Sequence, residues 1–254
     1  MPFASKEADV SRNKTTIGCD SEYFLKEITT GKIVSAIDKI PGTKETPYIL
    51  NSGAGIHPDC VSMELIFKFF TDFKAFNAHV VKTFLEVEIE LRKKGYEISD
   101  KVSHFFDEEE LQHPDSCIMG CSPDMSAWTG DFNPAPLPVG DLKTLRCNGS
   151  HPHVGTKSLT PDKHILFVKN MDLRLGMWSL TEDKDTDRRK LYGKAGAFRP
   201  KSYGIEYRVL SNFWTFTEAN RKKVWDGILL LVEDLETGKL EEVPEIVRRK
   251  INHG

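Results

Sequence analysis

The sequence has no long apolar run and little net charge, and each absence argues against a class of protein. None of its hydrophobic stretches approaches the roughly 20 residues that a membrane-spanning helix needs. The N-terminal segment lacks the apolar core of a signal peptide, so we expect residues 1–14 to form a flexible lead-in. A formal net charge of -3 over 254 residues gives no support for nucleic-acid binding.

Cysteines are few and odd in number, and several common catalytic motifs are missing. Five cysteines in a chain of this length favour reduced thiols in a cytoplasm over a disulfide framework. There is no G-x-x-x-x-G-K-[ST] phosphate loop, no G-x-S-x-G elbow and no H-E-x-x-H motif, which disfavours P-loop ATPases and α/β-hydrolases. No linker rich in Pro, Ser or Gly divides the chain, so we expect residues 1–254 to form one domain.

The first 67 residues predict mainly strands. Residues 15–28 and 32–37 are rich in β-branched and aromatic residues and flank Thr30-Gly31, so we expect a hairpin. Residues 41–58 are rich in Gly, Pro, Asn and Ser and predict a loop. Residues 59–67 predict a third strand.

Apolar residues then recur at spacings of four and three, which is typical of a helix with one buried face. Asp72 is a candidate N-cap and Gly95 a candidate C-terminal stop. We expect this stripe to pack in the core and to bind no cofactor. Its members are Phe69, Phe73, Phe76, Val80, Phe84, Val87 and Leu91.

The rest of the chain alternates strands and helices. A short strand is expected at 96–98 and a longer one at 143–155. Thr160-Pro161 begins a second helix with Ile165, Val168 and Met171 inward, and residues 218–235 predict the last helix. Hairpin-like connections in this order favour an α+β fold with a mainly antiparallel sheet over a doubly wound fold.

Polar residues occur at the strand period inside several of these segments. Side chains two apart share one face of a sheet, and burying several charges there is costly unless they bind a metal or each other. Carboxylate oxygens with few nitrogens suit Mg²⁺ or Mn²⁺ better than zinc. The residues are Asp20 and Glu22, His151 and His153, Glu206 and Arg208, with Glu64 alone in a further strand.

Residues 188–208 carry seven basic residues against one acid, Glu206. Gly193 and Gly196 interrupt the first half, which we expect to be a loop that closes over a ligand. The second half, from Tyr203 onward, predicts a strand. The basic groups in this segment suit phosphate or a substrate carboxylate; they are Arg189, Arg199, Lys201 and Arg208.

Simpler explanations and other metal sites stay open at this point. An Asp-x-Glu or His-x-His pair is often only a solvated strand face. His113, Cys117 and Cys121 are spaced like a structural zinc cluster, although no second ligand pair accompanies them. His151 and His153 with a carboxylate would also suit a catalytic zinc hydrolase.

Five segments resemble, in the same order, the phage-type COOH·NH2 ligases (type 2) of the glutamine synthetase and glutamate–cysteine ligase-like superfamily. They are IGCDSEYFL, DCVSMELIF, GCSPDMSAW, NGSHPHVG and the long RRKLYGKAGAFRPKSYGIEYRVLSNFW. The resemblance implies a glutamine synthetase-like fold, an antiparallel sheet curved around bound ATP and divalent cations. It also implies that ATP phosphorylates a carboxylate, that an amine attacks the acyl phosphate, and that an amide, ADP and phosphate are released.

Carried over position by position, the resemblance assigns the metal ligands. Asp20 and Glu22 look like the ligands of the first strand, and Glu64 like the next acidic ligand. His151 looks like the metal-binding imidazole and Glu206 like a further ligand. The implied cofactors are ATP and Mg²⁺, or Mn²⁺ in its place.

The resemblance also assigns the contacts to nucleotide and substrate. His153 and Arg208 look like nucleotide-phosphate contacts. Arg189, Arg199 and Lys201 look like a basic loop around the phosphates or the acyl substrate. Arg199, Lys201 and Arg208 would then be the catalytic cations.

Two departures from the family pattern leave questions open. Ile66 stands where a polar residue, often Asn, is expected, and a second paired glutamate has no match, which leaves the number of metal ions open. A phage protein that keeps the fold without activity is therefore a further hypothesis. The expected partners are small-molecule or peptide acids and amines, with no nucleic acid or membrane. Homo-oligomers are common in the superfamily, and a phage-encoded protein would act in the host cytoplasm.

Overall fold

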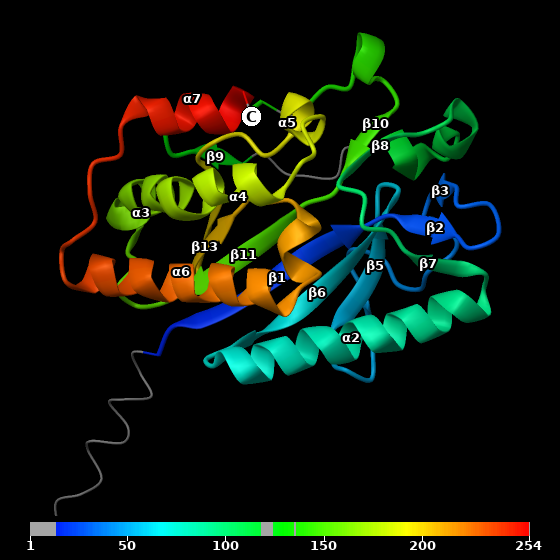
Figure 1. Cartoon of the computed structure of the whole chain (residues 1–254), viewed down its shortest axis with the longest axis horizontal. Coiled ribbons are helices and arrows are strands. Elements are labelled where there is room, and N and C mark those ends of the chain that lie inside the picture. Colours follow the sequence, from blue (N-terminus) through cyan, green and yellow to red (C-terminus); the bar gives the residue numbers. More distant parts are fainter. Residues whose placement is uncertain (1–13, 118–123, 135, 254) are drawn as a thin grey trace, which may run out of the picture.

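A central antiparallel sheet dominates the computed structural model, which describes residues 14–117, 124–134 and 136–253 (Figure 1). The expected lead-in at 1–14 lies outside this part except for Lys14. Within the described residues the strand order is β4-β5-β6-β1-β11-β13-β12-β9, and each neighbouring pair is antiparallel. In that order the strands are Tyr48–Ile49, Gly55–Asp59, Ser62–Phe70, Thr16–Tyr23, Ser150–Gly155, Gly204–Tyr207, Ala197–Lys201 and Met125–Ser126.

Two smaller sheets lie beside the central one. Strand β2 (Leu25–Glu27) pairs with β3 (Ile33–Val34) across a turn at Gly31, which confirms the predicted hairpin. On its other side β2 pairs with β7 (Tyr96–Ile98), the short strand predicted there. Strand β8 (Ser103–Phe105) pairs with β10 (Leu145–Cys147). The expected strand at 143–155 is therefore divided between β10 and β11.

The loop predicted for residues 41–58 is wrong, because this segment contains β4 and most of β5. The two strands form a hairpin around a turn in which Gly53 has a φ of 89°. Each strand is short, so turn residues dominate the local composition and hide the strand pattern.

The longest helix, α2 (Phe73–Lys93), begins and ends where the sequence predicts. The Asp72 side chain accepts a hydrogen bond from the backbone N–H of Ala75, and Gly95 follows the helix with a φ of 85°. Phe76 and most of the later stripe residues are buried. Phe73 and Phe84 are partly buried, and Phe69, which is exposed, belongs to β6 rather than to the helix.

The predicted second helix is irregular. It comprises α3 (His164–Met171), a π-helical turn (Asp172–Gly176) and α4 (Met177–Glu182). Val168 and Met171 are buried as predicted, but Ile165 is exposed. The last predicted helix is confirmed as α6 (Glu218–Glu236), and α5 (Arg188–Leu191) and α7 (Glu245–His253) are additional. None of the described helices is both long and apolar enough to cross a membrane.

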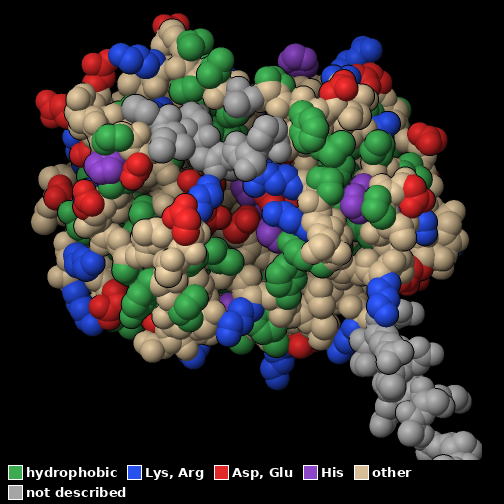
Figure 2. Space-filling model, turned by 180° about the vertical axis from the view of Figure 1, so that it is seen from behind, with side chains coloured by type: hydrophobic (Ala, Val, Ile, Leu, Met, Phe, Trp, Pro, Cys, Tyr) green, Lys and Arg blue, Asp and Glu red, His purple; other side chains and the backbone are tan. Residues whose placement is uncertain are grey.

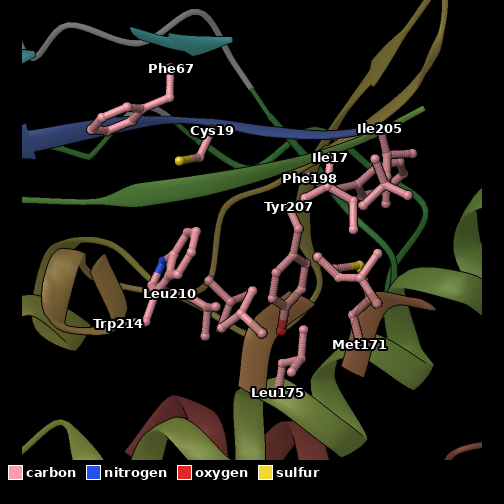
Figure 3. Packing of buried hydrophobic residues seen from close by; sticks show 14 of the residues in the cluster. Ile17, Cys19, Phe67, Met171, Leu175, Phe198, Ile205, Tyr207, Leu210 and Trp214 are labelled. Carbon is pink, nitrogen blue, oxygen red and sulfur yellow. The ribbon is translucent and has the colours of Figure 1, made fainter. Parts of the chain in front are cut away.

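Helices α2, α3 and α6 lie over one face of the central sheet and form the core with it (Figure 1). Figure 3 shows Ile17 and Cys19 of β1 on the same side of the sheet as Tyr207, above Met171 and Trp214. Because side chains alternate along a strand, the even-numbered residues of β1 point to the opposite face. The structure thus has an α+β fold, with flanking helices on one face and polar strand residues on the other.

Candidate active site

The polar residues singled out from the sequence lie on neighbouring strands of the central sheet. Asp20 is paired with His151, Glu22 is paired with Glu64, and His153 is paired with Glu206. Red, blue and purple side chains gather in a hollow on the face opposite to that of Figure 1, as Figure 2 shows. The polar residues that are spaced two apart in the sequence therefore form one connected cluster in the structure.

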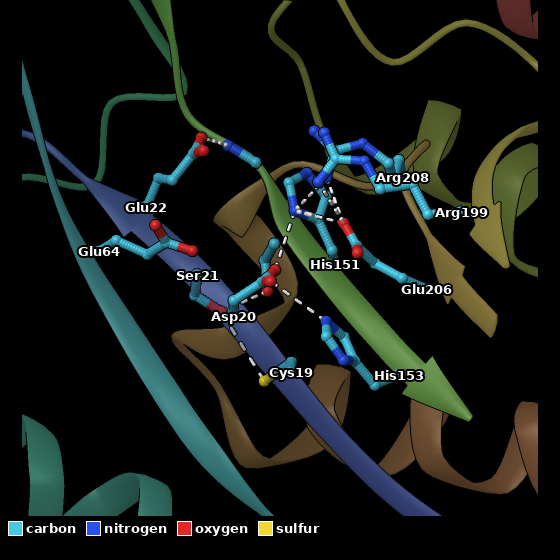
Figure 4. A network of polar contacts seen from close by, with 12 residues as sticks. Cys19, Asp20, Ser21, Glu22, Glu64, His151, His153, Arg199, Glu206 and Arg208 are labelled. Carbon is cyan, nitrogen blue, oxygen red and sulfur yellow. Dashed lines mark hydrogen bonds and ion pairs between the residues drawn. The ribbon is translucent and has the colours of Figure 1, made fainter. Parts of the chain in front are cut away.

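Asp20 is at the centre of this cluster and contacts both histidines (Figure 4). Its Oδ1 lies 2.9 Å from His151 Nδ1 and its Oδ2 lies 3.1 Å from His153 Nε2. Burial opposes ionisation of Asp20, but the two imidazoles outweigh it and hold the pKa of this carboxyl well below its usual value. Burial, and then the neighbouring Arg208, lower the pKa of His151, which favours a neutral imidazole.

Glu206 occupies the basic end of the cluster. Its carboxylate is ion-paired with Arg208, with Lys201 Nζ at 2.6 Å and with Arg199 Nη1 at 3.5 Å. Burial is the largest influence on this group and opposes ionisation; Arg208, His151 and Lys201 nevertheless lower the pKa of Glu206 to about 2. The predicted cations Arg199, Lys201 and Arg208 are thus all brought to one carboxylate.

Glu22 and Glu64 form the acidic end. The backbone N–H of Gly149 donates to Glu22 Oε2 at 2.6 Å, and His57 Nε2 lies 3.1 Å from Glu64 Oε2. Burial, followed by repulsion from Asp59 and Glu64, raises the pKa of Glu22 to about 8. Burial also raises the pKa of Glu64 despite its contact with His57. The crowded carboxyl groups at this end therefore resist ionisation, and a bound cation would favour their charged forms.

One group in the described residues has the geometry of a metal site. Ligand atoms of Asp20, His153 and Glu206 all lie within 4.8 Å of one another. Two hard carboxylates and one imidazole suit a divalent cation. This group contains His153 rather than the predicted ligand His151, while Glu22 flanks the group two residues along β1.

Among the described residues, three cavities adjoin the cluster, and we name each after one lining residue. The Cys60 cavity holds about 40 Å³ and is lined by Glu22, Asp59, Cys60, Ser62, Cys147 and His151, among others. The Leu191 cavity holds about 320 Å³ and is lined by Asp124, Pro134, Leu142, Arg188, Leu191 and Arg208, among others. The Thr156 cavity holds about 550 Å³ and is lined by Gly155, Thr156, Thr160, His164, Lys201 and Tyr203, among others.

Arg189 is not among the lining residues of these three cavities. It is buried and donates to Ser179 Oγ at 3.1 Å, whereas Arg188 lines both the Cys60 and the Leu191 cavities. The role of Arg189 as a phosphate contact stays a prediction. The side chain of Cys117 and the whole of Cys121 lie outside the described residues, so the zinc cluster with His113 is not tested.

The expected open glycine loop is instead packed into the protein, and α5 takes the place of its first part. Gly193 and Gly196 have φ values of 68° and 73°, and a Cβ on Gly193 would lie 2.1 Å from the Arg188 guanidinium. The N–H of Ala195 donates to Asn252 Oδ1 of α7 at 2.8 Å. The loop is therefore held in place by the C-terminal helix.

Several residues of the site were not found from the sequence. Asp124 Oδ2 accepts from Arg208 Nε at 3.1 Å, and Tyr203 OH lies 2.5 Å from His153 Nδ1. His57 contacts Glu64 from a segment that was predicted to be a loop. None of these residues belongs to a pair of polar residues spaced two apart along a strand, and no local sequence pattern identifies the residue that it contacts.

No protein-family model matches the chain, and no curated protein matches it either. The likeness to carboxylate–amine ligases therefore depends on the sequence motifs alone.

Proposed function

We propose that the protein is an ATP-dependent carboxylate–amine ligase that forms an amide through an acyl phosphate. The observation that carries this proposal is the charge order of the cluster. Glu22 and Glu64 lie at one end, Glu206 with its three cations lies at the other, and Asp20 with its two histidines lies between them. Such an arrangement suits a reaction that brings a metal–nucleotide complex against an anionic substrate.

The cations would counter the repulsion between the two reacting anions. In the first step a carboxylate oxygen forms a bond to the γ-phosphorus while the bond from that phosphorus to the β–γ bridging oxygen breaks, and ADP leaves. In the second step the amine nitrogen bonds to the acyl carbon, phosphate leaves and the nitrogen loses a proton. Arg199, Lys201 and Arg208 would stabilise the transferred phosphoryl group, and no Ser or Cys nucleophile is needed.

Asp20, His153 and Glu206 fit a divalent cation, and Glu22 and Glu64 would complete its acidic surroundings. Bound there, Mg²⁺ would neutralise charge on the nucleotide phosphates. Glu206 would exchange part of its contact with Arg208 for the cation. This exchange would free guanidinium donors for the phosphoryl oxygens.

The Thr156 cavity is the proposed nucleotide site. Its volume of about 550 Å³ is in the range typical of small-molecule pockets. The cavity contains Lys201 and Tyr203, which contact Glu206 and His153, so the phosphates would extend from it to the cluster. Thr156 and Thr160 offer hydroxyl groups for a ribose.

The test is calorimetric titration of ATP into the protein with and without Mg²⁺. We expect Mg²⁺-dependent binding that is lost in Glu206→Gln and retained in Glu90→Gln, a control on the exposed surface of α2. A folded protein that binds no ATP in either condition would refute the proposal. Where binding is found, acid and amine pairs are screened for ADP release.

The group formed by Asp20, His153 and Glu206 also suits a second function, that of a metal-dependent hydrolase. A zinc hydrolase of this kind would need bound zinc and no nucleotide. Zinc in the purified protein, with hydrolysis of model esters and no ATP binding, would favour this function. Loss of both metal and ATP binding with an intact fold would favour a phage protein that keeps the fold without activity.

A further inference from the structure

The Leu191 cavity is a large cavity beside the cluster that the proposed reaction leaves without a ligand. It shares His151, Arg188, Tyr192 and Arg208 with the Cys60 cavity, so its inner end reaches the polar cluster. At about 320 Å³ it is large enough for a small organic molecule. The Cys60 cavity, at about 40 Å³, has room for little more than water or a similarly small molecule.

The inner end of the Leu191 cavity carries buried positive charge. The Arg188 side chain is almost fully buried, and its Nε and Nη1 donate to the backbone carbonyls of Asn148 at 2.9 Å and Val209 at 2.8 Å. It forms no ion pair with a carboxylate in the part of the chain that the structure describes. A buried guanidinium that meets only carbonyl groups attracts an anion.

The remaining charged residues of the cavity add to this excess. Lys194 lines it together with Arg208 and Lys190, and Lys190 is ion-paired with Asp187. The acid Asp124 also lines the cavity, but its carboxylate is paired with Arg208. The cavity therefore favours an anionic ligand, and one whose charge lies at the inner end beside Arg188.

The walls of the same cavity are apolar. Pro134, Pro136, Leu137, Leu142 and Leu191 face it from two segments that are far apart in the sequence. Leu137 is 73% exposed, so its side chain covers little of the protein itself. An apolar ligand body would shield such side chains from water, whereas a fully polar acid would leave them hydrated.

From these observations we infer that the Leu191 cavity binds the acid substrate, a monocarboxylate with an apolar body whose carboxylate faces Arg188 and Arg208. This inference rests on the proposed ligase function, because it names the acid of that reaction. The carboxylate would lie beside His151, close to the phosphoryl-transfer cations. The apolar body would extend along Leu142 and Leu191 toward Leu137.

The test measures acid binding to the full chain without nucleotide, by calorimetry and by ligand-observed NMR. The probes are hexanoate, which has an apolar body, and succinate, which has a second charge in its place. Leu137→Asp puts a charge on the cavity wall. Val139→Asp is the matched control, because Val139 is 69% exposed on the same segment and does not line the cavity. Neither side chain is buried, so both variants are expected to fold.

We expect hexanoate to bind at least tenfold more tightly than succinate. Leu137→Asp should weaken hexanoate binding about tenfold, and Val139→Asp should change it less than twofold. Equal binding of the two acids, no hexanoate binding, or equal effects of the two variants would overturn the inference. Hexanoate binding without any binding of Mg²⁺ and ATP would support the acid site while the ligase proposal fails, and the reverse would remove the acid site alone.

Discussion

Asp172 connects the core to β13, the strand that carries Glu206 and ends just before Arg208, and its protonation should make the stability of the protein depend on pH. The carboxylate is fully buried in the π-helical turn. Its Oδ2 accepts from Trp128 Nε1 at 2.6 Å and its Oδ1 accepts from Tyr207 OH at 2.7 Å. Tyr207 lies between Glu206 and Arg208 on the opposite face of β13, so this contact fixes the strand from behind.

The expected magnitude follows from the pKa of this group. Burial raises the pKa of Asp172 from 3.8 to about 6, although the bonds from Trp128 and Tyr207 act against it. The folded state therefore holds the proton more tightly than the unfolded state. The resulting stability is fully present below about pH 4 and is lost as the pH rises through about 6. Linkage amounts to about 2 kcal/mol between about pH 4.5 and 7.5.

The assay compares urea unfolding of the wild type and Asp172→Asn across this pH range. The difference in free energy of unfolding should fall by about 2 kcal/mol from low to high pH, since other titrating groups cancel in the comparison. Tyr207→Phe removes a hydrogen-bond donor that lowers the pKa of Asp172, so the pKa of Asp172 should rise in this variant. The pH at which the variant loses the stability linked to Asp172 should rise with it. A difference between wild type and Asp172→Asn that does not change with pH would refute the reasoning.

Three further predictions concern the site, the core and the backbone. Glu206→Gln should abolish turnover while circular dichroism and melting temperature show an intact fold; full activity would remove Glu206 from the site. Phe76→Ala should lower the free energy of unfolding by about 3 to 5 kcal/mol, because it leaves an apolar cavity in the core. Leu85→Ala, on the exposed face of the same helix, should lower it by less than about 1 kcal/mol. Equal urea midpoints for the two variants would contradict this prediction. Gly204→Ala should lower the free energy of unfolding by more than about 2 kcal/mol. Its Cβ would lie 2.1 Å from the carbonyl oxygen of Val154, and Gly204 has a φ of 149°. Gly31→Ala, which has open space around it, should lower the free energy of unfolding clearly less in the same assay.

The parts of the fold that follow from local patterns could be predicted from the sequence. Helix α2 has a capping residue and a stop that both hold in the structure, and its periodic stripe holds from Phe73 onward but not at Phe69. The pairs at Asp20, His151 and Glu206 were found because period two places residues on one face of any strand, whichever strands are its neighbours. The antiparallel pairing then brought the faces together.

Contacts set by loops and by strand order could not be predicted in this way. Arg188 and Arg189 are adjacent and chemically identical, and only the packing of α5 decides which one meets the cavities. Asp124 reaches Arg208 across 84 residues of sequence. The helical sequence pattern continues through the π-helical turn that begins at Asp172, so no local signal in the sequence marks this irregularity.

Phe69 shows how one extra residue alters what a strand presents to the site. The pairing of β1 with β6 passes from Ile17 opposite Phe70 to Cys19 opposite Phe67, so β6 contains a bulge within this interval. Because of the bulge, Phe69 lies on the polar face. The centroid of its ring lies 5.8 Å from the ring centroid of His153 and 5.0 Å from that of Tyr203. A Cβ on Gly18 would lie 3.3 Å from that ring, so glycine there lets the ring lie close to β1. The stripe that predicted Phe69 as a core helix residue therefore includes, at its first position, an aromatic group of the polar face that contacts His153 and Tyr203.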